Sequence, residues 1–143
     1  MMKEQLKKIL ADHKVWVDTG EQSGKRADLR DAYLRNAYLR NADLCYADLT
    51  GADLNGADLH YANLTGADLT GAHLHGADLH GAYLTRAILH GADLSYADLT
   101  GAHFQLEFKS VRYFRNAIFS EAAIPWVILN PHWTEYADTV TFV

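Results

Sequence analysis

Carboxylate, imidazole and thiol groups recur along the middle of this chain, and these are the side chains that could carry chemistry. Two of the many aspartates, Asp58 and Asp78, each stand two residues before a histidine, His60 and His80. Carboxylates close to imidazoles are used in general acid–base catalysis and in zinc binding. The single cysteine, Cys45, adds one thiol that could act as a nucleophile. Each of these chemistries depends on elements that gather the groups in a site that excludes water.

A five-residue period determines what those elements can be. Alanine recurs at every fifth position from Ala27 to Ala102, sixteen times, and leucine recurs two residues later from Leu29 to Leu99. In an α-helix, with about 3.6 residues per turn, this spacing would scatter the leucines around the surface. In a continuous strand, successive leucines would point to opposite faces. The chain must therefore turn within every repeat, and identical repeated turns form a coil with alanine and leucine inside.

The position two residues after each leucine is expected to carry the turn. Glycine occupies it eight times, as expected where a tight turn needs a positive φ. Glycine is preferred there rather than required, because the same position also holds Asp31, Asn36, Asn41, Tyr46, Tyr61, Arg86 and Tyr96.

The tandem motif Ala-(Asp/Asn)-Leu followed by two further residues resembles the pentapeptide repeat family. The resemblance implies an all-β solenoid, a right-handed quadrilateral β-helix with four repeats per coil and with the alanine and leucine positions inside. On that basis residues 25–104 make four coils, and a repeat domain of about four to five coils extends over residues 25–124, with an irregular part at 105–113.

Both ends of such a coil need covering, because they expose unpaired backbone and an open core. We expect residues 1–24 to form an N-terminal helical cap and linker, with an α-helix over about residues 3–18 whose apolar face lies on the first coil. A membrane-surface role for this helix is less favoured because it is short. The apolar side chains at helical spacing are Leu6, Ile9, Leu10 and Trp16.

The C-terminal end is less regular. The five-residue phase is lost after Phe104 and returns further on, which indicates either a distorted fifth coil, the favoured interpretation, or an inserted loop. The residues that return to the phase are Phe114, Ala117, Phe119, Ala122 and Ile124. Aromatic residues, among them Phe104 and Phe108, would widen and close the interior. Residues 125–143 contain a strand-like TVTFV and form either a C-terminal cap, which we favour, or a dimerisation tail.

Residues twenty apart stack vertically if each coil holds four repeats. Two aspartate columns result, one of Asp28, Asp48 and Asp68 and one of Asp58, Asp78 and Asp98, and they form the candidate interaction surface. His60 then lies directly below His80. The repeat itself places these groups on a convex face with no enclosing pocket. We therefore predict no catalytic residue, no metal site, no cofactor and no enzyme activity, and we expect Cys45 to be inert on the outer surface.

Charge bears on the choice of partner. Between residues 27 and 104, ten aspartates face four arginines, which leaves six net negative charges. Over a coil about 20 Å tall this is about one charge per 3 Å, roughly half the density of B-DNA. Some proteins of the pentapeptide repeat family, which this chain resembles, imitate DNA and bind type II topoisomerases such as DNA gyrase. DNA mimicry is therefore the alternative function. The short rod, the arginines of the first coil and the lack of a long dimerising helix favour a rigid β-helical scaffold for protein–protein interaction with an unknown partner.

The remaining features of the composition bear on where the protein is expected to be found in the cell. The chain begins with no basic and apolar leader, and it has no apolar run of membrane-spanning length. A single cysteine excludes an internal disulfide. We expect a soluble cytoplasmic protein, monomeric or homodimeric through its C-terminal tail, that binds neither membranes nor nucleic acid directly.

Overall fold

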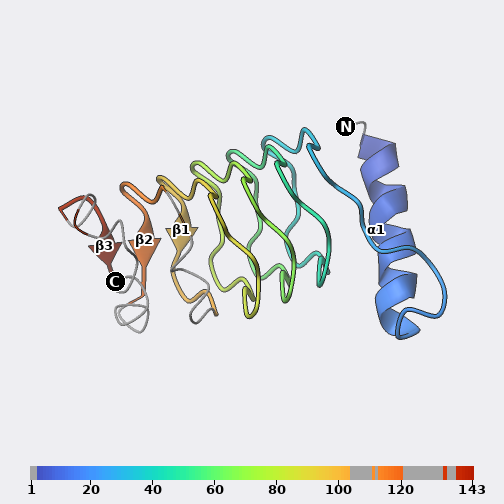
Figure 1. Cartoon of the computed structure of the whole chain (residues 1–143). Helices are drawn as coiled ribbons and strands as arrows, with labels where there is room; N and C mark the ends of the chain where they lie inside the picture. Colours follow the sequence, from blue (N-terminus) through green and yellow to red (C-terminus); the bar gives the residue numbers. More distant parts are fainter. Residues whose placement is uncertain (1–2, 104–110, 112, 121–133, 135–137) are drawn as a thin grey trace.

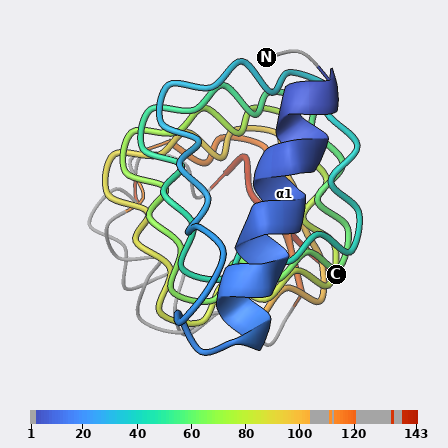
Figure 2. The same ribbon diagram turned by 90° about the vertical axis from the view of Figure 1, so that its right-hand side faces the viewer.

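The computed structural model describes residues 3–103, 111, 113–120, 134 and 138–143. A helix, α1 (Lys3–Asp18), lies at one end of a coiled chain (Figure 1). At the other end lie three short strands, β1 (Asp98–Leu99), β2 (Ile118–Phe119) and β3 (Thr141–Phe142). The stacked coils between these ends share one outline when viewed along the axis (Figure 2).

The coil closes every twenty residues, which is four repeats. Each bridging residue pairs in parallel with the residue twenty positions later, as Asp28 does with Asp48 and Asp48 does with Asp68. Two hydrogen bonds carry each pairing: the Leu29 N–H donates to the Asp48 carbonyl at 2.7 Å, and the Asp48 N–H donates to the Ala27 carbonyl at 2.9 Å. Each repeat is then closed by a tight turn, in which the alanine N–H donates to the preceding leucine carbonyl.

The alanines and leucines of the repeat fill the interior, as the periodicity predicts. The leucines from Leu29 to Leu99 are all buried, and those in the middle of the coil, such as Leu69, have no exposed surface. Ala37, Ala42 and Ala102 are only partly buried but still pack against this core. The alternation of a small and a large apolar side chain therefore produces one continuous narrow core.

The turn position adopts a left-handed backbone in every repeat from Asp31 to Gly101. The φ angles are +65 to +70° at the eight glycines and +53 to +62° at the seven other residues. The expectation of positive φ is confirmed. At Gly81 the missing side chain has a second purpose, because the ring of Tyr61 lies where a Cβ would be.

Helix α1 has the predicted bounds and crosses the open end of the coil obliquely (Figure 2). Leu6, Ile9 and Leu10 pack against the core. Trp16 was the fourth apolar residue expected to face the coil. Its ring instead stacks on the imidazole of His13, with 5.6 Å between the ring centroids. His13 is the fully buried polar residue of the helix, and the apolar pattern of the helix did not predict its burial.

The chain returns to the five-residue phase at Tyr113. This residue pairs in parallel with Asp93, and Phe114, Ala117 and Phe119 are fully buried, as predicted. Phe104, Phe108, Ala122 and Ile124 lie outside the described residues. Of residues 105–113 only Val111, which is buried, and Tyr113 are described. The structure therefore does not decide between a distorted coil and an inserted loop in this segment.

A strand is present in the C-terminal TVTFV segment, as expected. β3 pairs in parallel with β2, which pairs with β1, so the order in the sheet is β1-β2-β3. Val140 and Phe142 pack against the core. β3 thus covers the backbone edge of β2 within the same chain. Among the described residues, no helix is both long and apolar enough to cross a membrane.

Candidate functional site

The structure aligns the residues within each of the two predicted aspartate columns. Asp58 pairs with Asp78 and Asp78 with Asp98, each in parallel register. In the other column Asp28 pairs with Asp48 and Asp48 with Asp68. The vertical alignment of these six residues is confirmed, and their use as an interaction surface stays a prediction.

The column carboxylates also have a structural task. Asp58 Oδ1 accepts a hydrogen bond from the N–H of His60 at 3.2 Å, and Asp78 Oδ1 accepts one from the N–H of His80 at 3.0 Å. This is the local turn that Asp and Asn side chains make with a backbone two residues on. The same bond is made by Asp43, Asp48, Asp53, Asn63, Asp68, Asp93 and Asp98.

Most of the column residues are only partly exposed. The side chain of Asp58 is 24% exposed and that of Asp78 is 43% exposed; among the six column residues Asp28 is exposed and the other five are partly buried. Each of the six carboxylates accepts a hydrogen bond from a backbone N–H of its own turn. The preference for Asp or Asn before leucine was a sufficient sequence signal for this turn.

Arginines of the first coil neutralise the column residues nearest to them. Arg40 Nε lies 3.2 Å from Asp58 Oδ2, and Arg30 lies 2.6 Å from Asp28 and 3.7 Å from Asp48. The Arg30 guanidinium lowers the pKa of the Asp28 carboxyl to about 2. The negative character of the columns is consequently weakest at the end covered by α1.

His60 and His80 stack as predicted, with 4.7 Å between ring centroids and 15° between the planes. His60 Nδ1 lies 3.5 Å from Asp78 Oδ2 and makes no hydrogen bond. In the part of the chain that the structure describes, no group of three His, Cys, Asp or Glu side chains is arranged to hold a metal ion. This histidine pair therefore has too few neighbouring ligands for a structural zinc site.

The prediction for Cys45 is wrong in its location. The side chain is buried rather than on the outer surface, and burial, together with the negative charge of Asp43, raises the pKa of its thiol. His13 of α1 lies against the Cys45 backbone, so a histidine from outside the coil does reach this residue. A raised pKa disfavours the thiolate, which is the nucleophilic form, and the inertness of Cys45 stays a prediction.

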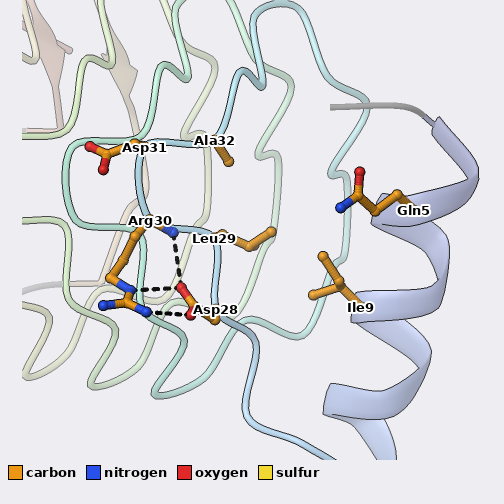
Figure 3. Close-up of a pocket in the computed structure, with 7 residues that line it drawn as sticks. All are labelled: Gln5, Ile9, Asp28, Leu29, Arg30, Asp31 and Ala32. Atoms are coloured by element: carbon orange, nitrogen blue, oxygen red, sulfur yellow. Dashed lines mark hydrogen bonds and ion pairs between the residues drawn. The ribbon is translucent and has the colours of Figure 1, made fainter.

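Two grooves flank α1 where it crosses the first coil. One has a volume of about 430 Å³, and the Arg30–Asp28 pair forms part of its wall (Figure 3). It is lined by Gln5, Ile9, Asp28, Leu29, Arg30, Asp31 and Ala32.

The second groove, here named the basic groove, has a volume of about 380 Å³. It is lined by Lys3, Leu6, Lys7, Leu10, Tyr33, Leu34, Arg35, Ala37 and Tyr38. This groove was not predicted from the sequence. A signal was present, because the consecutive repeats AYLRN and AYLRN replace the usual aspartate with Tyr33 and Tyr38.

Proteins similar to this chain include one whose solved structure agrees with this architecture. Among solved structures, a pentapeptide repeat protein from the thylakoid lumen of Arabidopsis thaliana is 27% identical, with a TM-score of 0.61 and coverage of 71% of this chain and 75% of that one. A pentapeptide repeat protein from Nostoc is 26% identical, with a TM-score of 0.37 and coverage of 93% of both chains. QnrB1, a plasmid-mediated fluoroquinolone resistance protein, is 20% identical, with a TM-score of 0.47 and coverage of 87% of this chain and 70% of that one.

Sequence comparison is decisive for the family. No curated protein sequence matches the chain. The sequence profile described as pentapeptide repeats matches it with 8 copies, over residues 25–60, 52–91 and 67–105. These matches span more than half of the chain and coincide with the coil that closes every twenty residues. The chain therefore belongs to the pentapeptide repeat family, whose members form right-handed quadrilateral β-helices.

Proposed function

We propose that the protein is a non-enzymatic, rigid scaffold that binds a partner protein through the outward-facing side chains of its coils. The observation that carries this proposal is the fixed register of the outer positions. Backbone hydrogen bonds hold Asp58, Asp78 and Asp98 above one another, while the alanine and leucine core beneath them is invariant. Outer side chains that do not make the turns can therefore vary without disturbing the core, as repeat proteins require for recognition.

The side chains with catalytic chemistry support a binding role rather than an enzymatic one. The column aspartates accept hydrogen bonds from their own turns, and the Cys45 thiol has a raised pKa. The two grooves lie beside α1, away from the stacked His60 and His80. His60, His80 and Cys45 line neither groove, and Asp28, which does line one of them, is paired with Arg30.

A second candidate function is DNA mimicry, in which the protein would bind and protect a type II topoisomerase such as DNA gyrase. The column of Asp58, Asp78 and Asp98 favours it, because three carboxylates follow one another in successive coils. The partial burial of Asp58 and its pairing with Arg40 weigh against it. The scaffold is therefore the stronger candidate.

A DNA supercoiling assay with purified gyrase separates the two functions. The scaffold proposal expects no inhibition by the wild-type protein at low micromolar concentration. Clear inhibition would overturn that ranking in favour of mimicry. In that case a variant with Asp58→Asn, Asp78→Asn and Asp98→Asn should lose the inhibition, because a basic DNA-binding surface is attracted through long-range charge.

The same triple variant tests the scaffold directly. Immobilised wild-type protein and the variant are compared for capture of proteins from an extract, with mass spectrometry as the readout. A partner retained by the wild type and lost by the variant supports binding through the columns. Equal capture by both would remove the columns from the proposed interface.

The ends of the coil have supporting roles in this proposal. Helix α1 acts as the N-terminal cap of a repeat domain of four to five coils, and β3 shields the backbone edge at the other end. An alternative role for the tail at 125–143 is dimerisation.

We propose that the protein is located in the cytoplasm, where a lone reduced cysteine is stable.

A further inference from the structure

The first coil departs from the repeat on two adjacent faces. Tyr33 and Tyr38 occupy the position that holds Asp53 and Asp58 in the coil above, and they pair with these residues in parallel register. Their exposed fractions are 77% and 90%. Large exposed aromatic side chains are enriched where proteins bind partners, because they contribute apolar area with few torsions to restrict.

Both tyrosines line the basic groove, whose walls combine apolar and cationic groups. Leu6 and Leu10 contribute from α1, and Leu34 contributes from the first coil. Lys3 and Lys7 stand on the helix side and Arg35 on the coil side. The groove thus offers an apolar surface flanked by cations from both of the elements that form it.

The charge of this groove is opposite to that of the whole chain. The protein carries a net charge of -5, whereas the residues that line the basic groove include three cations and no acid. Lys7 already pairs with Glu4 at 3.0 Å, and Arg35 pairs with the partly buried Asp53 at 3.5 Å. Both cations are themselves exposed, and pairs of exposed cations contribute little stability, so these cations can exchange partners for a bound carboxylate at small cost.

We propose that the basic groove binds an acidic peptide segment of a partner protein, with an aliphatic or aromatic side chain against Leu6, Leu10 and Leu34. Carboxylates of the segment pair with Lys3, Lys7 and Arg35, and Tyr33 and Tyr38 flank it. This inference rests on the scaffold function and adds the chemistry of the partner. It uses a surface separate from the aspartate columns.

A second copy of this chain is a poorer occupant. Its own carboxylates in the columns are committed to turns and partly buried, so the described coils present no protruding segment of acidic and apolar residues. An extended peptide suits an open groove between a helix and a coil, because it places side chains on the apolar surface while its charges reach both rims.

The test is selection of a random peptide library on the immobilised wild-type protein. Selected peptides are then measured against a groove variant, Lys7→Glu with Tyr38→Ala, and against a matched control, Lys8→Glu with Tyr83→Ala. Lys8 is an exposed helix residue outside the groove, and Tyr83 stacks on His103 in a distant coil. A variant carrying only Lys3→Glu and Lys7→Glu leaves the coil unchanged and serves if the groove variant is unstable.

We expect acidic peptides with apolar side chains, bound roughly tenfold or more weakly by the groove variant and nearly unchanged by the control. Their affinity should fall with added salt, because the cations are exposed. Selection of peptides without acidic residues, equal binding to the groove variant, no selection at all, or self-association through the groove would each overturn the proposal. The aspartate columns are intact in every variant, so failure here is distinct from failure of the scaffold function.

Discussion

The imidazole Nδ1 of His13, on helix α1, accepts a hydrogen bond of 3.0 Å from the backbone N–H of Ala27, at the start of the coil. His13 is fully buried, and its Nε2 makes no hydrogen bond. Burial lowers the pKa of His13 below its usual value of 6.5, with Asp43 opposing and Arg26 assisting this shift. The residue therefore joins helix to coil in its neutral form, because a proton on Nδ1 would remove the acceptor.

Acid should weaken the contact between α1 and the coil. The unfolded chain takes up a proton at His13 as the pH falls below 6.5, whereas the folded chain takes it up only at a lower pH. The stability contributed by neutral His13 is thus complete above that value and is lost as the pH falls through the folded pKa. Urea unfolding on either side of it measures the effect. A His13→Asn variant, which keeps a non-titrating acceptor, should show a smaller pH dependence, and an unchanged dependence would contradict this role.

Truncation of a central core leucine should be costly. Leu69 has no exposed surface, so Leu69→Ala leaves a cavity and should lower the free energy of unfolding by about 2–5 kcal/mol. The neighbouring Thr70 is only partly buried, and Thr70→Ala should change it by less than about 0.5 kcal/mol. Thermal melts compare the two variants. The reverse order would mean that the leucine position does not face the interior.

Asparagine should replace the column aspartates without loss of stability, whereas alanine should not. The Asn63 Oδ1 already accepts a hydrogen bond from the N–H of Thr65 at 3.1 Å, so the amide can make the same turn. The triple change to Asn at Asp58, Asp78 and Asp98 should therefore melt close to the wild type. The triple change to Ala leaves the three turn N–H groups without this acceptor, at a cost of about 0.5–1.5 kcal/mol each. Equal melting of both variants would show that these turns contribute nothing.

The Tyr61 ring should make Gly81 harder to replace than Gly71. Both glycines have a left-handed φ, +65° and +66°, so Gly→Ala costs each about 1–2 kcal/mol. At Gly71 the added methyl meets no atom within 4 Å, whereas at Gly81 it meets the ring of Tyr61. Gly81→Ala should therefore lower the melting temperature further. In a Tyr61→Gly background the two glycine changes should become similar, and a persistent difference would locate the strain elsewhere.

Removal of residues 1–20 should expose the first coil and cause association. Leu6, Ile9 and Leu10 would no longer pack on the core, and the backbone edge at Ala27 would lose His13. Light scattering should then show oligomers or aggregates. Lys8→Glu, on the exposed side of the same helix, is the control and should stay like the wild type. A well-behaved truncated monomer would mean that the helix is an appendage rather than a cap.

Local sequence was sufficient to predict the core positions and the left-handed turn positions. The alternation of alanine and leucine predicts which positions face inward, because their spacing suits neither a helix nor a straight strand. The bounds of α1 also followed from its pattern of apolar residues. The turns at Asp58 and Asp78 were missed, although they depend only on a contact between residues two positions apart. They were within reach of the sequence, because such turns are a local preference of Asp and Asn.

Contacts between distant residues were decided by the tertiary structure. The number of residues in each coil fixes which side chains meet, so the pairing of Arg35 with Asp53, eighteen positions apart, required the register of twenty. The bond from Ala27 to His13 and the basic groove both depend on how α1 lies across the first coil. A hydrophobic pattern specifies that a helix must cover an apolar surface, but it leaves the angle and position open. The angle and position of the helix are determined only by how its side chains pack against those of the coil.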